Sequence, residues 1–160
     1  MPDLFKNEKN FITIDKKFID VLKRECSNSE KNMSRLLMHL STEDNVQEML
    51  ICFGKKTLIP PNKSSNKSES LHVIEGKLLL IIFDDNGKVN NKIIMKPYGD
   101  NESFFIYRFN KCEWHTMIAL TDNVVVHEIL EGPFAKSENE IPIWIPKNRS
   151  DLKKFLEKIK

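Results

Sequence analysis

Short apolar runs broken by turn residues fill the middle of the chain, whereas apolar residues at helical spacing occur only near its two ends. The short runs predict strands near residues 46–53, 71–83, 88–96, 103–109, 114–120 and 124–130, with 141–145 as a final strand. The clearest hairpin signal is Asp84-Asp85-Asn86-Gly87, which joins two of these runs. Many short strands with regular turns indicate an all-β sandwich or barrel.

Helical periodicity predicts one helix near each end of the chain. The apolar face of the first helix is formed by Ile14, Phe18, Val21, Leu22 and Cys26. Thr13 or Asp15 could cap its amino terminus. The second helix is expected over about residues 150–160 with Ser150 as its N-cap. Its apolar positions are Leu152, Phe155, Leu156 and Ile159.

We expect a single domain over residues 1–160, because this length is sufficient for a buried core and no internal repeat divides it. Its parts would be a helical amino-terminal segment at about 11–40, a barrel at about 45–146 and a carboxy-terminal helix at about 150–160. The stretch 62–68 is rich in Ser, Asn and Lys, lies between predicted strands and is therefore a loop. Periodicity alone leaves immunoglobulin-like, jelly-roll and other β topologies open.

Charge and cysteine content indicate which partners and which cellular compartment to expect. The 25 basic and 23 acidic residues give a net charge of +2, which favours neither nucleic acid nor a membrane surface as a partner. Cys26, Cys52 and Cys112 lack CxxC spacing, which favours reduced thiols, and Cys52 in its apolar run is expected to be a small buried hydrophobe. No apolar run approaches ~18 residues and no signal-peptide pattern is present, so we expect a cytoplasmic protein.

Two segments resemble the motifs of the cupin family. Residues 60–76 read Pro-Pro-Asn-Lys-Ser-x-x-x-x-Glu-Ser-Leu-His-Val-Ile-Glu-Gly and are similar to the first cupin motif. Residues 110–115, Asn-Lys-Cys-Glu-Trp-His, are similar to the second, which is usually Pro-x-Gly-x-x-His. This resemblance implies an all-β, cupin-type double-stranded β-helix, or jelly-roll barrel, with flanking amino- and carboxy-terminal α-helices.

Over roughly residues 11–146 the chain also resembles the WbuC family of small proteins within the RmlC-like cupin superfamily. The segments that carry the resemblance are 37–40 (Leu-Met-His-Leu), 44–49 (Asp-Asn-Val-Gln-Glu-Met), 83–87 (Phe-Asp-Asp-Asn-Gly), 114–116 (Trp-His-Thr) and Glu128-x-x-x-Gly132-Pro133. Members of that family are associated with gene clusters for bacterial O-antigen (lipopolysaccharide) and other surface polysaccharides. The resemblance therefore implies a link to polysaccharide biosynthesis.

The metal-binding positions of the cupin motif are only partly filled. The motif reads His-x-His, four residues, Glu, six residues, Gly; Asn62 and Ser64 occupy the histidine positions, while Glu69 and Gly76 are in register. His115 would be the histidine of the second motif. Imidazole binds divalent transition metals far more strongly than an amide or hydroxyl oxygen. We therefore expect no metal, or a weakly bound divalent metal with Glu69 and His115 as residual ligands.

Strand alternation extends this picture to neighbouring polar residues. If Glu69 points into the barrel, as the resemblance implies, His72 on the same strand points away from it. A carboxylate inside a barrel requires a partner, and His115 is the expected one. His127 and Glu128 are adjacent in a strand, so one of the two should face inward.

Other residues are expected around the barrel. Asn62, Ser64 and Asn66 would line its mouth with neutral donors and acceptors suited to sugar hydroxyls. Lys63 and Lys67 could reach a phosphate or carboxylate, although both are interpreted as surface charges.

The resemblance suggests that the positions of Arg35 and His39 border the barrel. Their interpretation is structural, as polar contacts between the amino-terminal segment and the sheet. Trp114 and Trp144 are interpreted as packing anchors.

Two functions remain open at this level. In the first, Asn62, Ser64, Glu69 and His115 line a pocket that binds a small polar ligand such as a sugar or nucleotide sugar. In the second, the protein is a sugar isomerase or epimerase in which His115 acts as base and Glu69 orients it, with or without a weakly bound divalent metal. A metal-dependent oxygenase is disfavoured because its facial triad needs two histidines. A homodimer is also left open.

Overall fold

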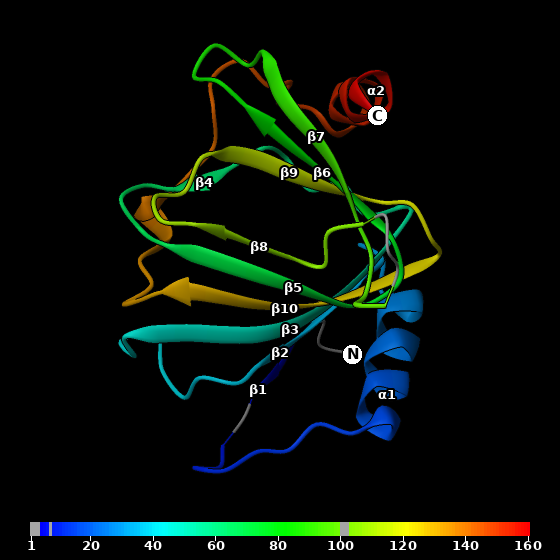
Figure 1. Ribbon diagram of the computed structural model, residues 1–160, viewed down its shortest axis with the longest axis vertical. Helices are drawn as coiled ribbons and strands as arrows, with labels where there is room; N and C mark the ends of the chain where they lie inside the picture. The colour runs from blue at the N-terminus through cyan, green and yellow to red at the C-terminus, as the bar shows by residue number, and fades with distance from the viewer. Residues whose placement is uncertain (1–3, 7, 100–102) are drawn as a thin grey trace.

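A computed structural model describes residues 4–6, 8–99 and 103–160 of the chain (Figure 1). Its largest sheet has six strands in the order β1-β2-β3-β10-β5-β8. These strands are β1 (Leu4–Lys6), β2 (Met33–Leu37), β3 (Val46–Gly54), β10 (Asn123–Glu131), β5 (Glu69–Glu75) and β8 (Ile106–Phe109). Every pair in this sheet is antiparallel except β1 with β2, which is parallel.

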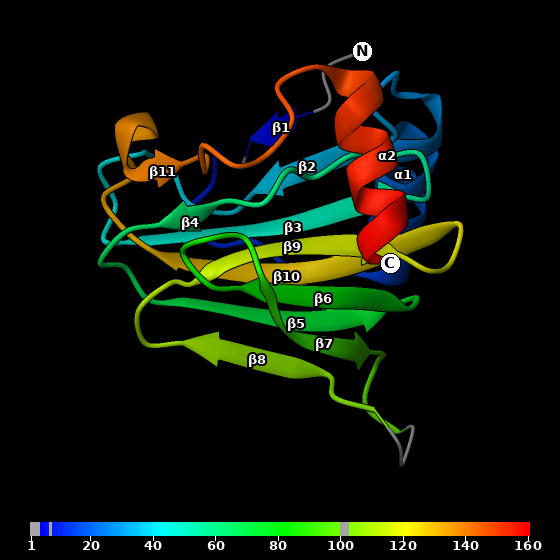
Figure 2. The same cartoon turned by 90° about the horizontal axis from the view of Figure 1, so that it is seen from above.

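A second sheet faces the first across the core and has the strand order β7-β6-β9 (Figure 1). Its strands are β6 (Leu78–Phe83), β7 (Val89–Met95) and β9 (Trp114–Ala119). The pairing of β6 with β7 confirms the hairpin predicted at residues 84–87. A short pair, β4 (Lys63–Ser64) with β11 (Asn139–Glu140), lies at one end of the barrel, and the 3-10 helix η1 (Lys136–Glu138) precedes β11 (Figure 2).

The core forms where alternate residues of the two sheets meet. Ile51 and Phe53 of β3, Leu71 of β5, Leu78 of β6 and Val126 of β10 belong to this buried cluster. Residues of opposite parity on β3 and β10 point to the outer face of the large sheet and pack under a helix. Because of this alternation, a polar residue that faces the barrel interior is surrounded by apolar side chains of the core.

The two predicted helices are present, one on the outer face of each sheet. Helix α1 (Lys16–Asn28) packs on β2 and β3, and Asp15 caps it by accepting a hydrogen bond from the backbone N–H of Phe18. Helix α2 (Arg149–Ile159) packs through Phe155 and Ile159 on the small sheet. Its N-cap is Asn148 rather than the predicted Ser150, because the Asn148 side chain accepts from the Asp151 N–H at 2.9 Å. Among the residues that the structure describes, no helix combines the length and apolar content that crossing a membrane requires.

The predicted strand 71–83 is two strands, β5 and β6, separated at Gly76. This glycine has a φ of +85°, and a Cβ at its position would lie 2.3 Å from the backbone oxygen of Asn123. Only glycine adopts this backbone conformation readily so close to another chain segment. The turn was not predicted from the sequence because the strands on both sides of it are apolar and read as one continuous run.

Two further sequence predictions are wrong. The segment 11–40 is not helical throughout, because β2 covers residues 33–37 and pairs with β3. Residues 141–145 do not form a strand, since the two-residue β11 ends at Glu140. Pro142 and Pro146 explain the second error, because proline lacks the N–H that a sheet ladder requires.

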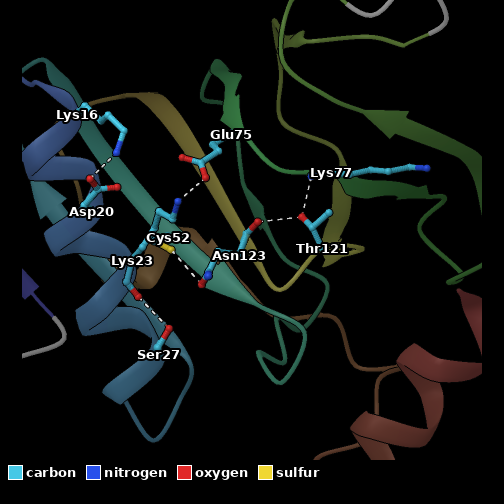
Figure 3. Close-up of polar contacts among 9 residues, drawn as sticks. All are labelled: Lys16, Asp20, Lys23, Ser27, Cys52, Glu75, Lys77, Thr121 and Asn123. Atoms are coloured by element: carbon cyan, nitrogen blue, oxygen red, sulfur yellow. Dashed lines mark hydrogen bonds and ion pairs between the residues drawn. The ribbon is translucent and has the colours of Figure 1, made fainter.

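Polar contacts hold α1 and the turns at one end of the barrel together (Figure 3). Lys23 of α1 forms an ion pair with Glu75 at the end of β5. The Thr121 hydroxyl accepts a hydrogen bond from the Lys77 N–H at 2.9 Å, which ties the turn after β5 to the turn before β10. Cys52 lies on β3 and is fully buried on the face that packs against α1, as predicted from its apolar run. All three cysteines are free thiols.

Candidate functional site

A cavity of about 380 Å³ opens into the barrel near β4 and β11. Its apolar walls come from the core and from neighbouring strands and include Met49, Ile51, Phe53, Ile59 and Met117. All four residues proposed from the sequence as ligand-binding line it, namely Asn62, Ser64, Glu69 and His115. The cavity therefore has an apolar floor and several polar groups from separate strands, a composition typical of small-molecule sites.

Glu69 faces the barrel interior, as strand alternation with the cupin register predicted. Glu69 and Leu71 are buried, whereas His72 lies on the outer face and its ring contacts Phe105. The Glu69 carboxylate accepts hydrogen bonds from the Tyr107 hydroxyl at 2.5 Å and from the Cys112 thiol at 3.5 Å. With His115, these donors satisfy a carboxylate that would be costly to bury alone.

The geometry around His115 fixes the roles of its two ring nitrogens. Its Nδ1 lies 2.8 Å from the backbone oxygen of Glu113, and since a carbonyl can only accept, Nδ1 carries a proton. Its Nε2 lies 3.3 Å from Oε1 of Glu69. A proton on Nε2 would make the ring an imidazolium paired with the carboxylate. The side chains of both residues are at least nine-tenths buried, at 5% and 8% exposed.

The electrostatics of this pair favour the charged forms. Burial raises the pKa of Glu69, but the hydrogen bond and charge of His115, with the donors Tyr107 and Cys112, outweigh it and hold this pKa below its ordinary value. Burial lowers the pKa of His115, but Cys112 and Glu69 outweigh it and hold this pKa well above its ordinary value. Burial, then the Glu69 charge, raises the pKa of Tyr107 well above its ordinary value. At neutral pH the site thus contains an imidazolium–carboxylate pair and a neutral phenol.

Sequence reasoning missed Tyr107 and Cys112 as members of this site. Tyr107 lies on β8 opposite Leu71 of β5, with its hydroxyl directed at Glu69. Its parity with the buried Phe109 is the signal that could have placed it inward. Cys112 lies three residues before His115 within the second cupin-like motif. No local pattern distinguishes it from a core cysteine, because its role depends on contacts with other strands.

Glu128 is a second carboxyl group facing the cavity. The sequence required either His127 or Glu128 to face inward, and Glu128 does so. His127 lies on the outer face, with its Nε2 2.7 Å from a Glu48 carboxylate oxygen. Burial and the charge of Glu69 raise the pKa of Glu128 to about 7, against smaller opposing effects from Arg35 and His115.

Arg35 and His39 both line the cavity, as expected for residues that border the barrel. On β2, Ser34 and Leu36 are buried towards α1, so strand alternation turns Arg35 to the cavity side. The ring of His39 contacts the backbone of β3 just beyond the end of β2, where its Nδ1 lies 3.1 Å from the backbone nitrogen of Glu48. The same Nδ1 also lies 3.0 Å from the backbone oxygen of Glu48, to which a protonated Nδ1 can donate.

The loop that carries Asn62 and Ser64 is fixed by backbone pairing. Asn62 and His115 exchange backbone hydrogen bonds of 3.0 and 3.1 Å, which joins the loop to β9 beside the site. The Asn62 amide donates to the Pro60 oxygen at 3.1 Å, and the buried Ser64 pairs through β4 with Asn139 of β11. The two positions expected to carry histidine in a cupin thus face the same cavity as Glu69 and His115.

The other loop residues behave differently from the sequence prediction. Asn66 has a φ of +61° and is not among the residues that line the cavity. Lys63 stacks over Trp114, with its ammonium nitrogen 4.3 Å from the ring centroid. Lys67 is buried rather than at the surface, because its ammonium pairs with Glu138 at 2.6 Å and also donates to a backbone oxygen. Trp114 and Trp144 pack together in the cluster under α2, as predicted for packing anchors.

Glu69, Cys112 and His115 could together hold a metal ion. Each offers one ligand atom, and these atoms lie within 4.8 Å of one another. In a tetrahedral zinc site, nitrogen and oxygen ligands about 2.1 Å from the metal lie roughly 3.4 Å apart, which matches the geometry of the pair. The imidazole Nδ1 donating to a backbone carbonyl is also the usual support of a metal-bound histidine. The donor set is nevertheless reduced from that of the cupin motif, since Asn62 and Ser64 stand in for imidazoles.

A family model described as a domain of unknown function, DUF6016, matches residues 14–95, which is half of the chain. The chain belongs to this family. The matched region runs from α1 to β7, so Asn62, Ser64 and Glu69 lie within it, whereas Cys112 and His115 lie beyond it. No curated protein matches the chain.

Solved structures resemble the chain in fold at low sequence identity. Protein SO0799 from Shewanella oneidensis is 8% identical with a TM-score of 0.55, over 67% of this chain and 72% of that chain. Oxalate oxidase in complex with glycolate is 11% identical with a TM-score of 0.51, over 68% of this chain and 55% of that chain. A cupin superfamily protein from Desulfitobacterium hafniense is 13% identical with a TM-score of 0.46, over 64% of this chain and 80% of that chain.

The two structures with TM-scores above 0.5 confirm the predicted fold class: the chain has a mainly β, cupin-type fold with two helices. At these low sequence identities, the similar structures are evidence for the fold alone. The chain spans about half the length of the oxalate oxidase that it matches.

Proposed function

We propose that this protein binds a small polar ligand of the sugar or nucleotide-sugar class in the barrel cavity. The observation that carries the proposal is the convergence of Asn62, Ser64, Glu69 and His115 on one cavity with apolar walls. These residues come from the loop, β4, β5 and β9, so their meeting depends on the whole barrel. Apolar walls with a few convergent polar groups bind and orient small ligands in many proteins.

The chemistry of the lining residues supports a ligand rich in hydroxyl groups. Asn62 and Ser64 offer neutral donors and acceptors, which match sugar hydroxyls better than they match a metal ion. The apolar wall, which includes Met49 and Met117, suits the C–H faces of a sugar ring. The resemblance to the WbuC family and its link to O-antigen gene clusters supports the same ligand class.

We propose further that a divalent metal is absent or only weakly bound. The Glu69 carboxylate already accepts hydrogen bonds from three donors, so a metal would compete with the protons of His115 and Cys112. Asn62 and Ser64 are weak ligands in place of imidazole. If bound, a divalent ion would supply Lewis acidity towards a ligand oxygen.

A sugar isomerase or epimerase is a second candidate, and Glu128 is the observation that favours it. A carboxyl group with a pKa of about 7 is matched to proton transfer at neutral pH. It lies near the Glu69–His115 pair, so the cavity contains groups that could accept and donate protons on a bound sugar. In this scheme His115 is the candidate acid or base and Glu69 orients it.

The test is ligand-induced stabilisation of the wild type and two histidine variants. Nucleotide sugars should raise the melting temperature of the wild type and of His72→Ala, because His72 lies outside the barrel. They should fail to raise that of His115→Ala. Ser64→Ala, which removes one buried hydroxyl, should weaken the response without unfolding the protein, and so serves if His115→Ala does not fold. An equal response in all variants would contradict the proposal, as would the absence of any response in the wild type.

A further inference from the structure

We propose that the ligand carries an anionic group, a carboxylate or a phosphate, and that Arg35 binds it. This inference rests on the proposed function, because it names the ligand class for the same cavity. It adds Arg35 to the ligand-binding residues. The cupin motifs do not include this residue, and our sequence analysis interpreted it as a structural contact.

The direction of Arg35 follows from the strand on which it lies. Its neighbours Ser34 and Leu36 face α1, where the Ser34 hydroxyl donates to the Leu22 oxygen at 2.7 Å and Leu36 is buried. Met33, two residues before Arg35, packs against the core between the sheets. Arg35 has the parity of Met33 and lines the cavity mouth, where its side chain remains exposed.

The guanidinium of Arg35 is not used within the fold. In the part of the chain that the structure describes, it has neither a hydrogen-bond acceptor nor an ion-pair partner. Two lysines in the neighbouring loop differ in this respect, since Lys63 stacks on Trp114 and Lys67 is paired with Glu138. Arg35 therefore presents its five donors to the cavity without an internal acceptor.

The carboxyl groups of the cavity do not replace a ligand anion at Arg35. Glu69 is paired with His115 and accepts hydrogen bonds from Tyr107 and Cys112. The charge of Arg35 acts on Glu128 through space and lowers the pKa of Glu128, but no ion pair joins the two side chains in the described part of the chain. Among the described residues, no carboxylate is therefore hydrogen-bonded or ion-paired with the Arg35 guanidinium, which leaves its donors for a ligand.

His39 lines the same cavity as Arg35. Its Nδ1 is engaged by the backbone of Glu48, at 3.1 Å from the nitrogen and 3.0 Å from the oxygen, so the charge of the cavity rim comes from Arg35. A planar guanidinium fork matches two oxygens of a carboxylate or phosphate better than it matches a hydroxyl. A ligand with an acidic group at Arg35 and hydroxyl groups at Ser64 and Asn62 fits these three side chains.

Calorimetric titration with matched sugars tests the inference. The probes are glucose, glucuronate and glucose 1-phosphate, with the equivalent galactose and mannose sets. They are titrated into the wild type, Arg35→Gln, Arg35→Lys and the control Arg108→Gln. Arg108 lies on β8 and contacts Ser70, on the outer face of the sheet. Arg35→Gln should fold as stably as the wild type, because the guanidinium has no internal partner.

The wild type and Arg108→Gln should bind an anionic member of a set at least about tenfold more tightly than the neutral sugar. Arg35→Gln should lose that preference while its affinity for the neutral sugar is unchanged, and Arg35→Lys should be intermediate. Comparison of glucuronate with glucose 1-phosphate separates the carboxylate from the phosphate. Equal affinities for neutral and anionic sugars, unchanged in Arg35→Gln, would overturn the role of Arg35 and leave cavity binding intact. Binding of no probe would overturn this inference, whereas the proposed function fails only if nucleotide sugars also leave the melting temperature of the wild type unchanged.

Discussion

At the scale of single residues, the central feature is the buried pair of Glu69 and His115. The cupin register of the sequence was sufficient to predict that both face the barrel and meet. It was not sufficient to predict Tyr107 and Cys112, which donate to the same carboxylate from β8 and from the segment before β9. Contacts of this kind depend on how separate strands are arranged in space, so the sequence pattern of a single strand does not predict them.

The pair predicts a strongly non-additive effect of mutation. His115→Ala should lower the free energy of unfolding by about 3–5 kcal/mol, because it leaves the Glu69 carboxylate buried without its counter-charge. Adding Glu69→Gln should restore part of that loss, since the uncompensated charge is then removed. Urea unfolding of the single and double variants measures both effects. Additive changes would mean that the two side chains do not interact as the geometry indicates.

Glu128 predicts a specific pH dependence of stability. Its pKa is raised from 4.5 to about 7 in the folded state, so the folded protein binds this proton more tightly than the unfolded chain does. The resulting stabilisation is fully present below about pH 4.5 and is lost as the pH rises to about 7, by about 1–3 kcal/mol. The charged or titratable groups that act on Glu128 come from four strands: Arg35, Glu69, Tyr107 and His115.

The variant Glu128→Gln should lack this loss, because glutamine does not titrate. The measurement is the free energy of unfolding of both proteins between pH 4.5 and 8, and the informative quantity is their difference. The variant should gain stability relative to the wild type as the pH rises towards 7. Parallel stability profiles would show that Glu128 titrates as an ordinary exposed carboxyl.

At the scale of elements, strand alternation and turn residues predicted most of the barrel, and the errors have local causes. Strand β2 is five residues long and combines inward and outward apolar residues, so it has no clear period of its own. Residues 141–145 are apolar but are bounded by prolines that prevent a ladder. The N-cap of α2 is Asn148 rather than Ser150, although both residue types cap helices well.

The turn between β5 and β6 gives a prediction with an internal control. Gly76→Ala should destabilise the protein by more than about 2 kcal/mol, because its φ is positive and the new Cβ meets the Asn123 backbone. Gly99→Ala should cost less, since φ there is also positive but, apart from its chain neighbours, no heavy atom of the described residues lies within 4 Å of the added Cβ. Equal losses in thermal unfolding would mean that the close approach at Gly76 has no energetic consequence.

The loop and β4 predict that a metal site can be restored. The double variant Asn62→His/Ser64→His would bring two imidazoles to the cavity that Glu69 and His115 already line. Two strong ligands added to two residual ones should create or greatly tighten binding of a divalent transition metal. Metal content of the purified variant, compared with the wild type, measures this. Unchanged metal content would show that these side chains do not converge on Glu69 and His115.

At the scale of the whole molecule, the sequence predicts the fold, but it predicts only part of the site. The cupin fold follows from strand spacing and two motifs, and solved structures only 8–11% identical share it. The cavity chemistry differs from that of the cupin motif because Asn62 and Ser64 replace imidazoles, while Arg35, Cys112, Tyr107 and Glu128 contribute side chains around the retained pair. A barrel scaffold can support many functions, so function here is argued from the site.

Chemical-shift mapping of backbone amides during titration with a nucleotide sugar tests the central claim most directly. If the barrel cavity binds the ligand, the largest shifts should cluster at Asn62, Ser64, Glu69 and His115, with Arg35 and Glu128 beside them. The outward-facing His72 and Ser70 serve as internal references on the same strand as Glu69, and their amides should shift less. Shifts confined to the outer faces of the sheets, or to the helices, would contradict a ligand site inside the barrel.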